Sequence, residues 1–253
     1  MPVKKVILYS LAALLLFTGF VVVRVPAALA LNYIGSKSGF LAPYQVSGTV
    51  WNGSATEMVV RYGGSSISLG LVEWQLSPWQ LLLGKLSVHL NANKGNQKIS
   101  GDFTAALGNR FQVEDAEIHL DIPTLTSLMK VRLPGQLQGM AELSLERLSY
   151  EGGSVMELAG TMVARDGVYV IGQPVVLGTY AAKLSLKDRL VNASLSDIDG
   201  AVAISGDVTV QPETREYHVN LTVRPKPDAN PMIGQALAAL TQQQSDGSFR
   251  ITR

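Results

Sequence analysis

The chain has 253 residues, no cysteine and a formal net charge of +1. The absence of cysteine excludes disulfides, zinc–thiolate sites and cysteine nucleophiles. Three of the 21 basic residues lie within the first thirty positions, so the remainder holds 18 basic and 20 acidic residues and we expect no nucleic acid as a partner. The length beyond position 30 suits one large β domain or two small domains.

The first thirty residues are predicted to be a membrane anchor. An uncharged run of eighteen residues, 6–23, follows Lys4 and Lys5 and ends at Arg24. Eighteen helical residues span roughly 27 Å, close to the ~30 Å hydrocarbon core of a bilayer. No polar face recurs along the run, which argues against a buried core helix. We therefore expect a single transmembrane helix in residues 1–30, with its N-terminus in the cytoplasm under the positive-inside rule.

A cleaved signal peptide is the alternative to an anchor. Residues 28–30 (ALA) have the A-x-A form of a cleavage site. The apolar run is longer than a typical signal core, and Arg24 and Pro26 separate it from that site. These two features favour an uncleaved anchor that leaves residues 31–253 outside the membrane, in the periplasm if the source is a bacterium.

Residues 31–40 are expected to be a juxtamembrane segment, with Tyr33 and Phe40 at the level of the lipid headgroups. Beyond this segment, apolar and polar residues alternate in many stretches, for example 86–91 and 201–210. Turn residues recur about every 8–15 positions, which predicts hairpins rather than βαβ units. We therefore expect a mainly β fold, a long antiparallel meander that forms either a curled sheet with a groove or a sandwich.

Three short helices are predicted within this meander, at residues 77–84, 122–129 and 231–241. The first has a Ser at the N-cap, Pro at the first helical position and Gly just beyond its end. No further segment between the anchor and the C-terminal region has a strong helical period over ten or more residues. Residues 248–252 are predicted to form a last edge strand.

Weak internal repetition divides the β-rich domain. The motif Ile-Ser-Gly-Asp occurs at residues 99–102 and again at 204–207, each time followed by a turn and an alternating strand. This predicts two related halves, at about 41–130 and 131–253. The alternative is that any β meander reuses the same residue types.

Signatures of catalysis are absent from the sequence. His89, His119 and His218 lie on the polar faces of predicted strands, without the partner spacing of a metal site. No nucleophile elbow, P-loop or dinucleotide-binding motif occurs. We expect no catalytic residue, no cofactor and no metal, so an enzyme of the cell envelope is the least favoured interpretation.

The three tryptophans, Trp51, Trp74 and Trp79, lie within thirty residues of one another. One interpretation is a shared aromatic core, in which each indole N–H finds one partner. The other is an apolar groove or an interface, because tryptophan also anchors protein contacts and membrane surfaces. These three residues are the candidate groove or interface site.

Residues 48–55 (GTVWNGSA) and 74–86 (WQLSPWQLLLGKL), with one N-terminal anchor and no cysteine, resemble the type II secretion system protein N family. The resemblance covers essentially the whole chain. It implies a single-pass protein of the bacterial inner membrane, with a periplasmic β-rich domain and no catalytic residues. It also implies a distant similarity to AsmA-like envelope proteins, whose sheets curl into an apolar groove.

Two functions follow as hypotheses. The first is an accessory structural or assembly component of the type II secretion machinery that contacts other components, in the inner-membrane platform or the secretin. Exposed strand edges near Trp51 and at 248–252 are its candidate contact sites. The alternative is an AsmA-like envelope protein whose apolar groove binds or conducts phospholipid.

Overall fold

The computed structural model describes residues 3–62, 65–128, 134–214 and 216–252. The helices are α1 (Val3–Val23), α2 (Ala27–Ser38), α3 (Pro78–Leu82), α4 (Ile122–Leu128) and α5 (Pro231–Leu240). The strands are β1 (Leu41–Gly48), β2 (Asn52–Tyr62), β3 (Ser65–Ser68), β4 (Leu71–Leu76), β5 (Lys85–Lys94), β6 (Gln97–Ala106), β7 (Arg110–Asp121), β8 (Gln136–Glu151), β9 (Ser154–Ile171), β10 (Gln173–Lys187), β11 (Leu190–Gly200), β12 (Val202–Val210), β13 (Tyr217–Pro225) and β14 (Phe249–Thr252).

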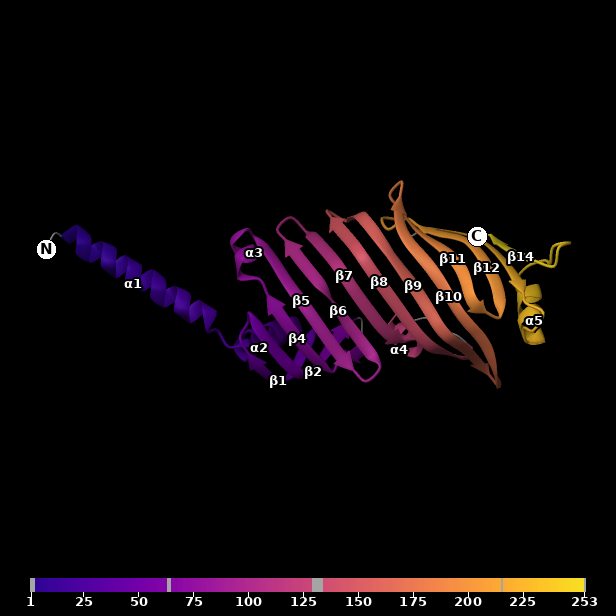
Figure 1. Ribbon diagram of the computed structural model, residues 1–253, viewed down its shortest axis with the longest axis horizontal. Helices are drawn as coiled ribbons and strands as arrows, with labels where there is room; N and C mark the ends of the chain where they lie inside the picture. Colours follow the sequence, from indigo (N-terminus) through magenta and orange to yellow (C-terminus); the bar gives the residue numbers. More distant parts are fainter. Residues whose placement is uncertain (1–2, 63–64, 129–133, 215, 253) are drawn as a thin grey trace.

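The strands form one antiparallel sheet in which nearly every strand pairs with its neighbours in the chain (Figure 1). β3 is the exception, because it pairs with β2 beside the main path. β1 and β14 are the two ends of the path, so the sheet is not closed. The mainly β meander expected from the sequence is confirmed, and a single sheet excludes the sandwich. The division into two halves remains a prediction, and β7 pairs with β8 without a break between them.

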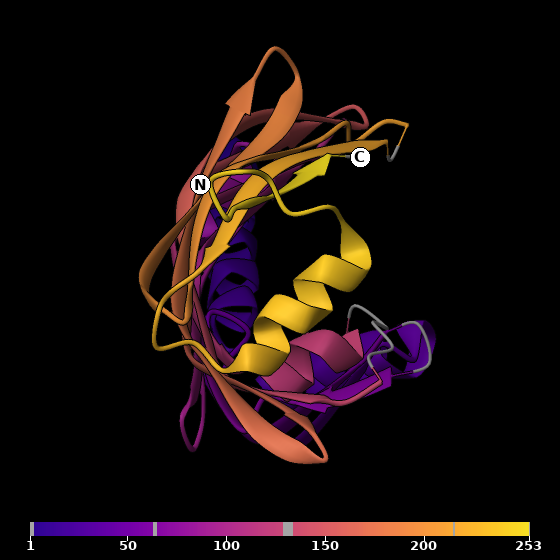
Figure 2. The same ribbon diagram turned by 90° about the vertical axis from the view of Figure 1, so that its right-hand side faces the viewer.

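The sheet curls, and α2, α4 and α5 lie within the curve (Figure 2). We call this side the inner face and the opposite side the outer face. On β4, Val72 and Trp74 are 0% and 8% exposed on the inner face, whereas Leu71 and Glu73 are exposed on the outer face. The period of two in the sequence therefore separates an apolar inner face from a more polar outer face.

Two buried clusters lie on the inner face. The first joins α2 to the strands nearest the N-terminus and consists of Ala27, Ala55, Met58, Val72, Trp74 and Ala92. The second, in the middle of the sheet, consists of Val113, Ala116 and Leu145. The core is therefore most complete where α2 covers the sheet.

Helix α2 is a correction to the sequence prediction, which treats residues 31–40 as a juxtamembrane segment and has no helix there. Pro26 precedes α2 with an extended backbone, and Gly39 ends it in the left-handed region at φ 62°. Ala27 and Leu31, one helical turn apart, pack on the first cluster. Tertiary packing of these two side chains stabilises a helix that its own sequence pattern does not predict.

The three short helices are confirmed within two residues at each end. Asn230 caps α5, because its side chain accepts a hydrogen bond from the N–H of Met232 at 3.0 Å. The predicted Ser77 cap of α3 makes no such bond, although Gly84 adopts φ 72° just beyond that helix. The predicted last strand is also confirmed as β14.

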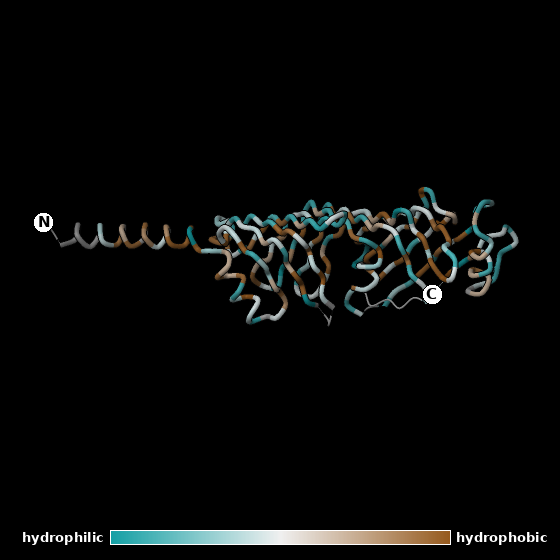
Figure 3. Tube along the Cα trace, turned by 90° about the horizontal axis from the view of Figure 1, so that it is seen from below, coloured by the Kyte–Doolittle hydropathy of each residue, from teal (hydrophilic) through white to brown (hydrophobic). Residues whose placement is uncertain are grey.

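Helix α1 projects from the β1 end of the sheet (Figure 1), and the coloured part of its tube is mainly hydrophobic up to its C-terminal end (Figure 3). Among the described residues, no helix has both the length and the hydropathy that crossing a membrane requires. The transmembrane helix expected from the sequence is therefore not confirmed.

The two copies of Ile-Ser-Gly-Asp have related geometry. Gly101 and Gly206 both have positive φ, 156° and 134°, and each backbone lies against the next strand, so a Cβ at either position would clash. The aspartates that follow bond to the preceding strand: Asp102 to His89 and Asp207 to Ser194. Both copies therefore mark a close strand approach.

Candidate functional site

The end of α1 is attached to the turn between β1 and β2. The indole Nε1 of Trp51 donates a hydrogen bond to the carbonyl oxygen of Val22 at 2.9 Å. The backbone N–H of Val50 donates to the carbonyl of Val25 at 3.0 Å. The last carbonyls of a helix lack a full set of partners within the helix, and the bond from Trp51 adds one to Val22, which also accepts from the N–H of Val25 at 3.4 Å. We call this contact between residues 22–25 and residues 50–51 the junction.

Trp74 has a different role from Trp51. Its side chain is 8% exposed in the first cluster, and its Nε1 donates to the carbonyl of Val50 at 3.1 Å. The ring lies against Gly53, where an added Cβ would be 2.5 Å from Cζ2 of the indole. Trp74 is thus a core residue that supports the junction from beneath.

Trp79 lies on α3 and is 76% exposed. It faces an open apolar cavity of about 770 Å³ between the last turn of α1, the junction and α3. The residues around this cavity are Gly19, Val22, Val23, Arg24, Thr49, Trp51, Pro78, Trp79, Leu81 and Leu82. The structure therefore brings Trp51 and Trp79 to one cavity and places Trp74 in the core.

Sequence reasoning missed the exposed leucines beside Trp79. Leu82 and Leu83 are 77% and 78% exposed, and Leu107, in the turn between β6 and β7, is 79% exposed. A Cβ on Gly84 would lie 3.7 Å from Cδ1 of Leu107, so this turn adjoins the end of α3. The run of three leucines at 81–83 could have indicated this patch. Three consecutive residues of a helix cannot all lie on one buried face, so at least one of the leucines is exposed.

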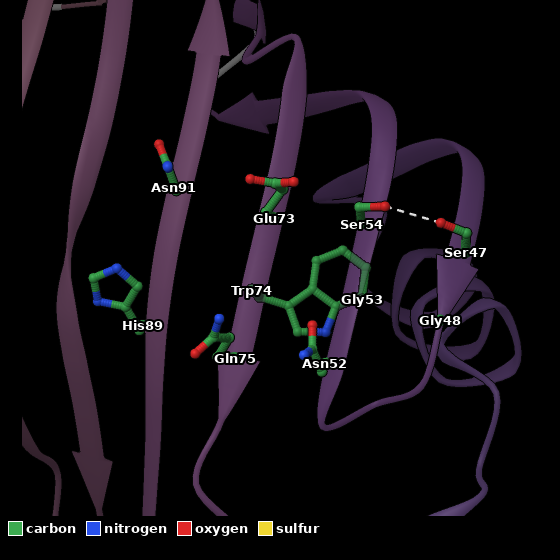
Figure 4. A pocket seen from close by; sticks show the side chains of 10 residues that line it. All are labelled: Ser47, Gly48, Asn52, Gly53, Ser54, Glu73, Trp74, Gln75, His89 and Asn91. Atoms are coloured by element: carbon green, nitrogen blue, oxygen red, sulfur yellow. Dashed lines mark hydrogen bonds between the residues drawn. The ribbon is translucent and has the colours of Figure 1, made fainter.

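A second, polar recess of about 390 Å³ opens on the sheet near β1, β2, β4 and β5 (Figure 4). Its lining consists of Ser47, Gly48, Asn52, Gly53, Ser54, Glu73, Trp74, Gln75, His89 and Asn91. The hydroxyls of Ser47 and Ser54 are hydrogen-bonded at 2.9 Å, and Nδ1 of His89 lies 2.9 Å from a carboxylate oxygen of Asp102. Glu73 is the single carboxylate in the lining, so the recess lacks the carboxylate pair of acid–base catalysis.

No group of three or more histidine, aspartate or glutamate side chains in the described part of the chain is arranged to hold a metal. His89 is paired across strands, as its place on a polar strand face predicts. His218 is exposed on β13. The absence of an enzymatic, cofactor or metal role stays a prediction.

An ion pair interrupts the apolar inner face near β11. Nζ of Lys226 lies 2.8 Å from a carboxylate oxygen of Asp197, and both side chains are largely covered. The hydrogen bond from Lys226 lowers the pKa of Asp197. Tyr180 lies opposite Asp197 in register, and burial raises the pKa of its phenol. This network joins β10, β11 and the chain after β13 without forming a cleft.

The two edges of the sheet differ. At β14, the chain that follows α5 covers part of the edge: Gln243 bridges to Phe249, and the hydroxyl of Thr241 donates to the carbonyl of Arg250 at 3.0 Å. β1 forms the other edge, beside α2, and pairs with β2 among the described strands. Tyr44 of β1 is 67% exposed.

Asp246 holds the cover of β14 in place. One carboxylate oxygen accepts hydrogen bonds from the N–H and the hydroxyl of Ser248, at 3.0 and 2.6 Å. The other accepts from Arg224 at 2.6 Å. These bonds, those from Ser248 first, lower the pKa of Asp246 to about 2.

Comparison with known families gives one match across the sheet. The family model described as "Type II secretion system (T2SS), protein N" matches residues 42–252. The chain belongs to the type II secretion system protein N family. The resemblance seen in residues 48–55 and 74–86 is therefore confirmed, and family membership links this protein to type II secretion.

This chain is similar over almost its whole length to two proteins, each named "Type II secretion system protein N". The protein from Aeromonas hydrophila is 27% identical over 254 residues, covering 97% of this chain and 96% of its own. The protein from Vibrio cholerae serotype O1 is 24% identical over 251 residues, with the same coverage. No solved structure matches the chain.

Proposed function

We propose that this protein is an accessory structural or assembly component of the type II secretion machinery, held in the inner membrane by α1 and acting through protein contacts of a periplasmic sheet. The observation that carries the proposal is the family match over residues 42–252, which spans almost the entire sheet. The lining of the polar recess holds one carboxylate, Glu73, and therefore lacks the carboxylate pair of acid–base catalysis, which favours contacts over chemistry.

The proposed anchor rests on the sequence of the full run 6–23, which includes residues whose side chains lie outside the described part. The described side chains of α1 add support. Leu16 and Phe17 are 76% and 66% exposed, and α1 stands apart from the sheet (Figure 1). A helix that is apolar on all sides needs apolar surroundings, which a bilayer supplies.

An uncleaved N-terminus also fits the packing of α2. Ala27 is 1% exposed in the first cluster, and cleavage after Ala30 would remove it together with the first turn of α2. In this proposal the N-terminus is cytoplasmic, residues 1–30 include the anchor, and residues 31–253 are a periplasmic domain. At ~4.8 Å between strands, the path from β1 to β14 extends up to roughly 60 Å from the anchored end.

Strand addition at β1 is the contact mode that we propose. An edge strand offers backbone N–H and C=O groups with which a partner strand can pair. The edge at β14 is partly covered by its own chain, whereas β1 pairs only with β2 among the described strands and, in this proposal, lies near the membrane. The partner would be another secretion component, in the inner-membrane platform or the secretin.

Co-purification tests this function. The full chain carries a C-terminal affinity tag and is expressed at its native level, then extracted from membranes in mild detergent after brief cross-linking. We expect other secretion components to be recovered with it, and to be absent when an unrelated single-pass protein carries the tag. Recovery of the protein alone, from membranes that contain an assembled machine, would contradict the proposal.

A lipid-binding groove is the second candidate, because one row of the inner face is apolar across six strands. Register pairs join Ile99, Ile118, Leu143, Met162, Ala182 and Leu195, each of them only partly buried. Native mass spectrometry of the detergent-purified protein distinguishes this candidate. Phospholipid adducts at low activation would support it, and a clean apo mass would count against it.

A further inference from the structure

Four large apolar side chains form an exposed patch at one corner of the sheet. Trp79, Leu82 and Leu83 belong to α3 and the residue after it, and Leu107 lies in the adjoining turn. Each is more than three-quarters exposed. Such a cluster is unusual on a surface that meets only water, where apolar residues are scattered singly. We call these four residues the α3 patch.

The α3 patch lies beside the end of α1. Trp79 and Leu82 share the 770 Å³ apolar cavity with Val22 and Val23 of α1 and with Arg24, the residue after it. The hydrogen bond from Trp51 to Val22 joins the two sides of that cavity. The patch is therefore held at the level of Arg24, where the apolar run of α1 ends.

The charge of the chain is unevenly distributed along the same axis. Residues 24–101, which follow the apolar run, contain six basic and two acidic residues, whereas residues 102–253 contain 13 basic and 18 acidic residues. The strands are stacked in chain order (Figure 1). The positive excess therefore lies at the end that carries α1 and α3, the acidic excess lies in residues 102–200, and residues 201–253 have equal numbers of basic and acidic residues. Residues 74–101, which include α3, contain no acidic residue, and Lys85 lies two positions after Leu83.

We infer that the α3 patch docks into the surface of an anionic phospholipid bilayer, the one in which α1 is anchored. The inference rests on the anchoring of α1 in the proposed function. Tryptophan favours the headgroup region, and leucines insert at the boundary between headgroups and acyl chains. Arg24 and Lys85 provide the cations that anionic headgroups attract. The patch thus fixes the orientation of the sheet against the membrane.

The depth of the patch and the local absence of carboxylates favour a lipid surface over a protein partner. The end of α1 sets the depth of the patch at the headgroups, so lipid is the neighbour that the anchored chain brings to it. Carboxylates, which lipid phosphates would repel, are absent from residues 9–56 and 74–101 around the junction and α3.

The chain has no cysteine, so single-cysteine variants of the full chain report each position separately. Leu82→Cys and Leu83→Cys are labelled with an environment-sensitive fluorophore, and the protein is reconstituted into phosphatidylglycerol-containing vesicles. Phe17→Cys on α1 is the reference for lipid contact. Val176→Cys on β10, 65% exposed, is the matched control for an exposed apolar position far from the patch.

We expect the probes at 82 and 83 to emit at shorter wavelength than the probe at 176 and to be quenched by lipids that carry a nitroxide near the headgroup. Lys85→Glu should reduce that quenching. Probes at 82 and 83 that behave like the probe at 176, while the probe at 17 is quenched, would overturn the docking but leave the anchor intact. An unquenched probe at 17 would overturn both the anchor and the docking. If the probe at 82 emits at shorter wavelength only after secretion proteins are added, the patch binds a protein partner and the inference is overturned.

Discussion

The indole Nε1 of Trp51 donates a hydrogen bond to the carbonyl oxygen of Val22, 29 residues earlier in the chain, at 2.9 Å. The bond joins the last turn of α1 to the turn between β1 and β2. Trp74 supports the same turn from the core, through its bond to the carbonyl of Val50. The position of the sheet relative to α1 therefore depends on two tryptophans that make different contacts with one short turn.

Replacing Trp51 with Phe should loosen the junction. The substitution removes the donor to Val22 and keeps an aromatic ring, so the expected cost is about 1 kcal/mol, typical of one hydrogen bond. The N–H of Val50, which donates to Val25 across the same junction, should exchange with solvent faster. Hydrogen exchange by mass spectrometry on the reconstituted chain measures this.

Trp79→Phe is the control for that experiment, because Trp79 is exposed and lies outside the hydrogen bonds of the junction. Exchange at Val50 should not change in this variant. Equal acceleration in both variants would show that general loss of tryptophan surface, rather than the bond to Val22, controls the junction.

Gly53→Ala should destabilise the protein by about 1–3 kcal/mol, as expected for overpacking. The new methyl group would lie 2.5 Å from the indole of Trp74 and 2.7 Å from the carbonyl oxygen of Ser47. The matched change is Gly234→Ala in α5. The added Cβ would have no atom within 4 Å beyond its chain neighbours and its own helix backbone, and alanine favours the helix by roughly 0.5–1 kcal/mol. Urea unfolding of both variants should give shifts of opposite sign, and a neutral Gly53→Ala would contradict the packing of Trp74.

The sequence pattern predicts the strands well for a physical reason. Alternation at 201–210 and 217–224 reflects one buried and one exposed face, and these segments form β12 and β13. Short helices with proline at their first position were predicted equally well. α2 was not, because Ala27 and Leu31 stabilise it only by packing on strands that come later in the chain.

The sequence predicts where in the chain the candidate site lies, but not the environment of each tryptophan. Proximity in sequence groups Trp51, Trp74 and Trp79, yet their environments differ. Trp74 is buried because it alternates with exposed residues on β4, whereas Trp79 is exposed at the end of the sheet. The contact of Trp51 with Val22 joins segments far apart in the chain, and no local pattern indicates it.

Acid should weaken the cover of β14 through Asp246. Its pKa is lowered to about 2 from an ordinary value of 3.8, so its contribution to stability is complete above about pH 4 and is lost as the pH falls towards 2. Asp246→Asn should lower the melting temperature at neutral pH and lose this acid-dependent component. Asp228→Asn, which also removes one acidic charge, is the control. If the difference in melting temperature between the wild type and Asp246→Asn stays constant from pH 5 to pH 2, ionised Asp246 does not stabilise the cover of β14.

A photo-crosslinking amino acid in place of Tyr44 should capture a secretion component in living cells. Tyr44 lies on the edge strand β1 and is 67% exposed. The same substitution at Val176, 65% exposed on β10 in the middle of the sheet, should give little product. Adducts identified by mass spectrometry test strand addition at β1. Equal capture at both positions, or capture at Val176 alone, would place the contact elsewhere.

An assembly role predicts that the composition of the secretion complex changes in membranes that lack this protein. Complexes from the deletion strain and from its parent are separated under native conditions, and their components are quantified by mass spectrometry. We expect export to be impaired and at least one component to be depleted from the complex, with recovery when the full chain is restored. Loss of export from a complex of parental composition would contradict an assembly role.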